Sequence, residues 1–101
     1  MNSIIDKNLE RIKQLCQKHN VKKLYAFGSV CTDSFNEHSD VDLIVEFENE
    51  NYYPEYADNY FSLADNLENL FNRKVDLLAD KTLKNPYFIK EVNKSRSLIY
   101  G

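Results

Sequence analysis

Two short segments decide the fold: residues 27–30, FGSV, and residues 39–45, SDVDLIV. In the first, one of the chain's two glycines stands directly before a serine, at the end of an apolar run. In the second, two aspartates separated by one valine open the most apolar part of the chain. The pattern raises the question of why two negative charges stand together at the start of a buried strand.

Alternation around the aspartates predicts a β-strand over residues 41–47, because successive side chains of a strand point to opposite faces. One face would carry Val41, Leu43, Val45 and Phe47, and the other Asp40, Asp42, Ile44 and Glu46. A second buried strand is expected over residues 21–27, ending at Gly28. A third, short strand is expected over residues 74–79, where Asp76 is an unusual residue for a strand.

Helical spacing of apolar residues predicts a helix over about residues 3–18 and another over about 56–72. A last helix should begin at Asn85 and Pro86, a capping residue followed by proline at the first helical position. Alternating helices and strands imply an α/β (α+β) architecture, with a small mixed sheet packed against helices in one domain, residues 1–101. The long connection through the second helix allows the last strand to lie beside its predecessor.

Composition excludes several classes of function. The net charge is −3, hydrophobic residues make up 43% and aromatic residues 13% of the chain, which is typical of an ordered globular protein. Direct binding to nucleic acid or to an anionic membrane is not expected from this charge. The start of the chain lacks the pattern of a signal peptide, and Cys16 and Cys31 lack metal-ligand spacing. We therefore expect a cytoplasmic protein with two reduced thiols.

The aspartates form the chemical signal. Asp40 and Asp42 project from the same strand face with Cα atoms roughly 6.5–7 Å apart, so their charges repel and lose hydration. A divalent metal compensates for such crowding, and magnesium suits a pair of carboxylates that also meets substrate phosphates. If Asp76 lies on a neighbouring strand, three carboxylates share one surface, which is enough for the two-ion arrangement used in displacement at phosphorus.

Gly28 and Ser29 complete this interpretation. Glycine lets the backbone turn sharply and approach a ligand closely, and the amides and the serine hydroxyl that follow a strand can face phosphate oxygens. A nucleoside triphosphate would then bridge the turn and the metal. By themselves, Gly-Ser is usually a turn and Asp-x-Asp is usually surface decoration. An EF-hand is excluded because Ile44 and Val45 occupy its fifth and sixth positions.

The combination resembles the minimal nucleotidyltransferases of the DNA polymerase β-like superfamily over nearly the whole chain. Their pattern is Gly-Ser, ten residues, Asp-x-Asp and a third aspartate on a later strand, matched by Gly28-Ser29, Asp40-Val41-Asp42 and Asp76. The ending, from residue 83 to residue 101, is also typical of these proteins. The resemblance implies a nucleotidyltransferase-like fold and transfer of AMP from ATP to a hydroxyl.

The family also implies roles for the matched residues. Gly28 and Ser29 would hold the triphosphate, Asp40 and Asp42 would ligate two Mg²⁺ ions, and Asp76 would ligate one ion and help to deprotonate the acceptor. Many relatives are antitoxins that AMPylate a tyrosine of a HEPN-domain ribonuclease toxin. The resemblance therefore implies an antitoxin that forms a hetero-oligomer with such a toxin, or a homodimer.

One position departs from the family pattern: Thr32 stands where relatives often carry an arginine, and Lys22, Lys23 or Lys74 could replace its charge. Two alternatives therefore stay open. The protein could be a non-catalytic antitoxin that acts by binding alone, or an adenylyltransferase for a small molecule such as an aminoglycoside antibiotic. Other interpretations concern His38, near the metal or in a solvated loop, and the cluster of Tyr52, Tyr53, Tyr56 and Tyr60, as a partner surface, a base-stacking platform or core.

Overall fold

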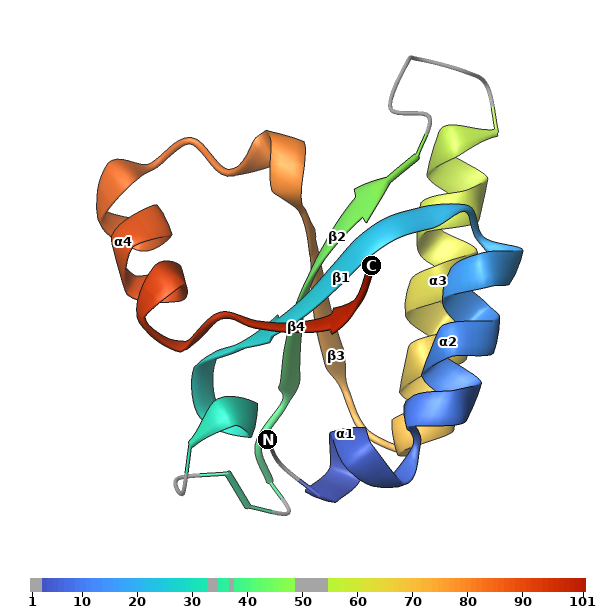
Figure 1. Cartoon of the computed structure of the whole chain (residues 1–101), viewed down its shortest axis with the longest axis horizontal. Coiled ribbons are helices and arrows are strands. Elements are labelled where there is room, and N and C mark those ends of the chain that lie inside the picture. Colours follow the sequence, from blue (N-terminus) through green and yellow to red (C-terminus); the bar gives the residue numbers. More distant parts are fainter. Residues whose placement is uncertain (1–2, 33–34, 37, 49–54) are drawn as a thin grey trace.

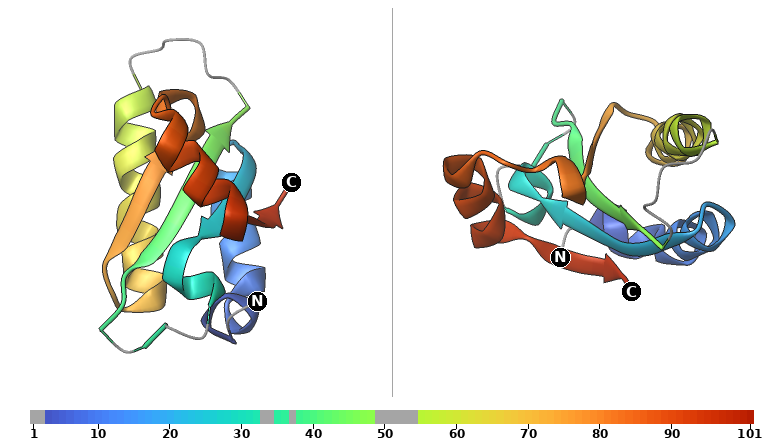
Figure 2. Two further views of the ribbon diagram at one scale, coloured as in Figure 1. Left: turned by 90° about the vertical axis from the view of Figure 1, so that its left-hand side faces the viewer. Right: turned by 90° about the horizontal axis from the view of Figure 1, so that it is seen from above.

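The computed structural model describes residues 3–32, 35–36, 38–48 and 55–101. Its strands are β1 (Val21–Phe27), β2 (Val41–Phe47), β3 (Val75–Ala79) and β4 (Ser97–Tyr100). Its helices are α1 (Ser3–Lys7), α2 (Leu9–Lys18), α3 (Tyr56–Phe71) and α4 (Pro86–Ser95), and short 3₁₀ turns, η1 (Gly28–Cys31) and η2 (Asp80–Thr82), follow β1 and β3. The sheet lies between α2 and α3 on one face and α4 on the other (Figures 1 and 2).

The sheet is mixed, with the strand order β3-β2-β1-β4. β1 runs antiparallel to both β2 and β4, whereas β2 and β3 are parallel. Parallel neighbours need a crossover connection, and α3 supplies it between β2 and β3. The expectation of a small mixed sheet, with the third strand beside its predecessor, is therefore confirmed.

The two faces of the sheet have cores of different size. The larger core lies between the sheet and helices α2 and α3, and its buried members include Ile12, Cys16, Leu24, Leu43, Val45, Leu63, Leu67 and Leu77. The smaller core lies under α4 and joins Phe27, Ile44 and Val92. Because Ile44 is buried on the same face as Asp42, the aspartates border an apolar region.

One expectation about the elements is wrong, and one strand has no counterpart among the expected elements. The helix predicted over residues 3–18 is broken at Asn8, whose side-chain amide donates to the Ile4 carbonyl at 2.8 Å. Asparagine side chains compete in this way for backbone groups. The additional strand is β4, whose residues follow the last helix and pair with residues 24–26 of β1.

Helix boundaries follow the remaining signals closely. Asn20 and Asn72 adopt positive φ angles of 58° and 54°, the left-handed conformation that often follows a helix and that asparagine tolerates. The Asn85 side chain accepts hydrogen bonds from the N–H groups of Tyr87 and Phe88, which confirms the predicted start of α4. Within the described ranges, none of the helices combines the length and apolar character that crossing a bilayer requires.

Candidate nucleotide and metal site

The glycine turn lies directly against Asp42. Gly28 follows β1 directly, has a φ of +72° and begins η1, whose Val30 is fully buried and anchors the turn in the core. A Cβ atom added at Gly28 would lie 2.7 Å from Asp42 Oδ2. Glycine is therefore required here twice, for its positive φ and for its close approach to a carboxylate.

Strand register brings the predicted carboxylates together. Asp42 of β2 is paired with Asp76 of parallel β3 on one side and with Phe27 of β1 on the other. Residues paired across neighbouring strands project from the same face, and Asp40, two residues before Asp42, belongs to that face as well. The structure thus places all three aspartates at the α4-covered face, beside the glycine turn.

The three carboxylates also influence one another electrostatically. Burial raises the pKa of the Asp42 carboxyl, and the charges of Asp76 and Asp40 raise it further. Asp42 is half-buried, whereas Asp40 and Asp76 are exposed. The site therefore holds one carboxylate that loses hydration and two that reach solvent. Together they form a negatively charged surface that a bound cation would stabilise.

The carboxylates fit magnesium, although the described part of the chain forms no complete metal cage. Among the residues that the structure describes, no three His, Cys, Asp or Glu side chains converge on one point in a way that could hold an ion. Mg²⁺ is usually bound through one or two carboxylates together with substrate phosphates and waters, so it needs no such cage. Asp42 together with Asp76 or Asp40 would supply these carboxylates.

Ser95, at the end of α4, also belongs to the site and was missed from the sequence. Its Oγ accepts a hydrogen bond of 3.0 Å from the backbone N–H of Gly28. The two residues are 67 positions apart, and no local pattern marks the pair. The bond ties the glycine turn to α4 and leaves Gly28 to act by its small size, because its N–H is already used.

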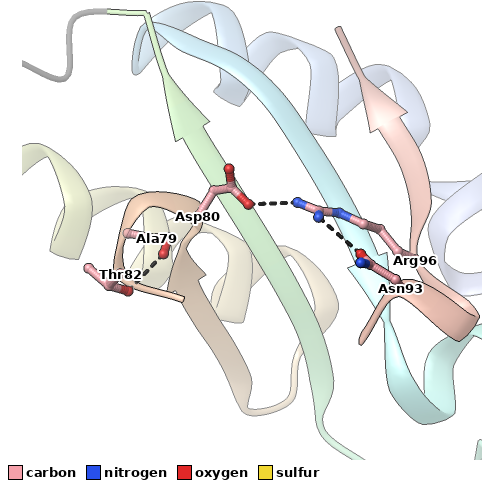
Figure 3. Close-up of polar contacts among 5 residues, drawn as sticks. All are labelled: Ala79, Asp80, Thr82, Asn93 and Arg96. Carbon is pink, nitrogen blue, oxygen red and sulfur yellow. Dashed lines mark hydrogen bonds and ion pairs between the residues drawn. The ribbon is translucent and has the colours of Figure 1, made fainter. Parts of the chain in front are cut away.

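An arginine clamp holds α4 over the sheet next to Ser95. Arg96 Nη2 pairs with Asp80 Oδ1 at 2.7 Å, and Nη1 contacts Asn93 Oδ1 at 3.4 Å (Figure 3). The same guanidinium group lies 4.0 Å from the centre of the Tyr25 ring. Asp80 begins η2, where Thr82 Oγ1 donates to the Ala79 carbonyl. The clamp therefore joins the end of β3, the middle of the sheet and the end of α4.

A second arginine organises the segment that leads to Asp40. Arg73 Nη1 donates to the backbone carbonyls of Asn36 and Ser39, both at 3.0 Å. Its guanidinium also lies 4.6 Å from the centre of the Phe35 ring. Because Arg73 directly precedes the β3 region, it connects the segment before one aspartate with the strand that carries Asp76.

The positions that departed from the family pattern can now be placed. Thr32 Oγ1 and its N–H both lie 3.0 Å from the Ser29 carbonyl, so this threonine closes the turn that carries the predicted phosphate ligand. Lys22 and Lys23 begin β1, roughly 15–20 Å along the strand from Gly28, too far to replace an arginine there. Lys74 is better placed, because its carbonyl accepts from the N–H of Val41.

The remaining candidates are a histidine and two tyrosines whose contacts indicate structural roles. His38 is exposed, and its backbone N–H donates to Asn36 Oδ1 at 2.8 Å. Tyr56 and Tyr60 pack against the larger core, and the Tyr60 hydroxyl donates to the Leu77 carbonyl. These two tyrosines therefore serve the core, while Tyr52 and Tyr53 lie outside the described residues.

The family model described as "Polymerase beta, Nucleotidyltransferase" matches residues 10–101. The chain belongs to the polymerase β nucleotidyltransferase family. MJ1379 of Methanocaldococcus jannaschii, provisionally named a protein adenylyltransferase, is 37% identical over 102 residues, which cover 93% of this chain and 98% of that protein. Membership agrees with the glycine turn and the aspartates described above.

Solved structures show the same fold. A structure described as a minimal nucleotidyltransferase superposes with a TM-score of 0.75 at 26% identity and covers 96% of this nucleotidyltransferase and 95% of its own chain. One chain of the complex between a tri-AMPylated HEPN toxin of Shewanella oneidensis and an MNT antitoxin matches with a TM-score of 0.66 at 18% identity; the match covers 95% of this chain and 71% of that chain. The mixed four-stranded sheet with its helices is thus the minimal nucleotidyltransferase fold.

Proposed function

We propose that this nucleotidyltransferase is a magnesium-dependent protein adenylyltransferase. It transfers AMP from ATP to a hydroxyl group, by analogy a tyrosine, of a HEPN-domain ribonuclease, and it acts as the antitoxin of that ribonuclease. The single observation that carries the proposal is the register pairing of Asp42 with Asp76 beside the Gly28 turn. The naming of MJ1379 and the fold shared with an MNT antitoxin support the choice of a protein as acceptor.

Binding of ATP begins at the glycine turn. The Ser29 hydroxyl and the backbone beside Gly28 hold the triphosphate, and Thr32 fixes the turn through the Ser29 carbonyl. Because Gly28 has no side chain, the Asp42 carboxylate lies directly against the turn, where a magnesium ion would link it to the triphosphate. The turn therefore orients the α-phosphate toward the face that carries the aspartates, which is the positioning on which phosphoryl transfer depends.

Asp76 receives the acceptor. It is exposed on β3, an edge strand of the sheet, so a hydroxyl on a large partner can reach it. The acceptor hydroxyl gives its proton to the Asp76 carboxylate while its oxygen bonds to the α-phosphorus. The bond from the α-phosphorus to the oxygen that bridges to the β-phosphate breaks, and pyrophosphate leaves.

Asp40, Asp42 and Asp76 would hold magnesium with the phosphate oxygens. When bound, Mg²⁺ supplies charge neutralisation for the phosphates and for the leaving pyrophosphate. It also compensates the two effects that raise the pKa of Asp42, burial and neighbouring negative charge.

The test is transfer of label from ATP radiolabelled at the α-phosphate to a HEPN-domain ribonuclease that forms a complex with this chain. We expect labelling of the partner that requires Mg²⁺ and is lost in Asp42→Asn. Asp65→Asn is the matched control, because it removes the same charge from an exposed position of α3. Absence of label on the partner with the unmodified chain contradicts the proposal.

Neutralisation of the ribonuclease separates catalysis from binding. We expect Asp42→Asn to lose neutralisation in proportion to its loss of label transfer. Full neutralisation by this variant instead indicates an antitoxin that acts by contact alone. Drug resistance conferred by the chain without a partner indicates the small-molecule acceptor.

A further inference from the structure

A cleft beside the glycine turn has no role in the chemistry described so far. It has a volume of about 350 Å³ and lies between the end of β1 and helix α4. Its lining residues are Phe27, Gly28, Phe88, Val92 and Ser95, with Glu91 and Lys94 at the rim. This volume falls within the range of small-molecule sites in proteins.

The walls of the cleft are aromatic. The rings of Phe27 and Phe88 meet edge to face, with centroids 6.1 Å apart and planes at 88°. Phe27 is buried, but Phe88 is 40% exposed although it is a large apolar side chain. The Phe27 contact therefore restrains an aromatic ring that still offers surface to a ligand, and buried Val92 packs with Phe27 below it.

The polar side of the cleft is Ser95. Its Oγ accepts from the Gly28 N–H, and its own O–H proton makes no hydrogen bond within the described ranges. A hydroxyl in this state can donate to an oxygen atom of a ligand. At the rim, Lys94 Nζ and Glu91 Oε1 form an exposed ion pair at 2.9 Å, so the entrance is polar.

Gly28 connects this cleft to the aspartates. One side of the glycine faces Asp42, and its N–H on the α4 side is bound by Ser95. A triphosphate held at the turn carries its nucleoside on the α-phosphate, so the base and the sugar must lie within a few bond lengths of Gly28. The cleft lies at this distance, because Gly28 itself forms part of its lining. Tyr56 and Tyr60, the other aromatic candidates for stacking on a base, pack instead against the larger core.

We propose that the cleft between β1 and α4 binds the nucleoside of the nucleotide substrate, with the purine base stacked on Phe88 and Ser95 donating to a sugar or phosphate oxygen. This inference rests on the proposed function, because it assumes a triphosphate at the Gly28 turn. Stacking on an aromatic residue tolerates different bases, so Phe88 contributes affinity for nucleosides in general.

Calorimetric titration with Mg²⁺·ATP and with Mg²⁺·tripolyphosphate tests the assignment. We expect Phe88→Ala to weaken ATP binding by roughly 5- to 100-fold, the effect of losing one stacked base, and to leave tripolyphosphate affinity within about twofold. Phe88→Trp should keep ATP affinity. Phe61→Ala is the matched control, since Phe61 is 63% exposed on α3, away from the cleft.

The outcomes are distinct. Unchanged ATP binding in Phe88→Ala, or equal weakening of both ligands, overturns the nucleoside site and leaves the proposed function in place. Binding of neither ligand by the unmodified chain overturns the proposed function together with this site. If Phe88→Ala fails to fold, the amide NMR spectrum of the unmodified chain with Mg²⁺·ATP provides the test. Chemical-shift changes at Phe88 and Ser95 that Mg²⁺·tripolyphosphate does not cause support the nucleoside site. Absence of these changes refutes it.

Discussion

Replacing Gly28 by alanine probes the close approach on which the site depends. The positive φ of 72° costs an alanine about 1–2 kcal/mol relative to glycine. The new methyl group would lie 2.7 Å from Asp42 Oδ2, and turning the carboxylate away adds about 0.5–1.5 kcal/mol. We therefore expect Gly28→Ala to lower the free energy of unfolding by about 2–3 kcal/mol, a fall in Tm of roughly 10–20 °C for a domain of this size.

Label transfer should fall more steeply than stability, by about 100-fold, because displacement of Asp42 by even 1 Å disturbs the positions of the reacting groups. Thermal unfolding followed by circular dichroism measures the first effect, and α-labelled ATP the second. In an Asp42→Ala background the stability penalty of Gly28→Ala should shrink to the backbone strain alone. Asparagine tolerates positive φ better than alanine does. Gly28→Asn should therefore keep the close contact between the new Cβ atom and Asp42 Oδ2 but have less backbone strain than Gly28→Ala. A Tm within 1 °C of the unmodified chain would refute the reasoning.

Three further predictions concern charge, the arginine clamp and the helix cap. Burial and two neighbouring carboxylates raise the pKa of Asp42, so its ionisation opposes folding above that raised pKa. Asp42→Asn should therefore be more stable than the unmodified chain in urea at pH 7, and the difference should vanish below about pH 3.8. Equal stability of the two proteins at pH 7 contradicts this. Arg96→Gln loses the ion pair with Asp80 and the contact with the Tyr25 ring. It should lower the free energy of unfolding in urea by about 1–3 kcal/mol. A decrease below about 0.3 kcal/mol would show that the clamp is unimportant for stability. Asn85→Ala should lower stability by about 1 kcal/mol and Asn85→Asp should keep it, and the cap is disproved if both behave alike.

The sequence predicts the central part of this fold because alternation there is unambiguous. β1 and β2 have the expected bounds, and the apolar set of β2 faces the larger core as the alternation requires. β4 escapes prediction for a physical reason. It has four residues, Leu98 is exposed, and its pairing partners in β1 are more than 70 positions away.

The site residues also divide into those that sequence patterns predict and those that they do not. Gly28, Asp42 and Asp76 are found from spacing, because a parallel neighbour and a shared strand face follow from local patterns. Ser95 and Arg73 are not found, because each acts through long-range contacts that only the packed chain creates. Roles that depend on tertiary contact carry no periodic signal in the chain.

The in-register pairing of Asp42 with Asp76 also limits how the chain length can vary among relatives. Insertion of one residue between Val75 and Asp76 would turn the carboxylate toward the buried helices, because side chains alternate along a strand. Insertion of two residues would restore the face but separate the two carboxylates by about 6.6 Å along the strand. Homologues that retain the chemistry should therefore show insertions and deletions outside this stretch, and a gap within it would mark a chain that has lost the reaction.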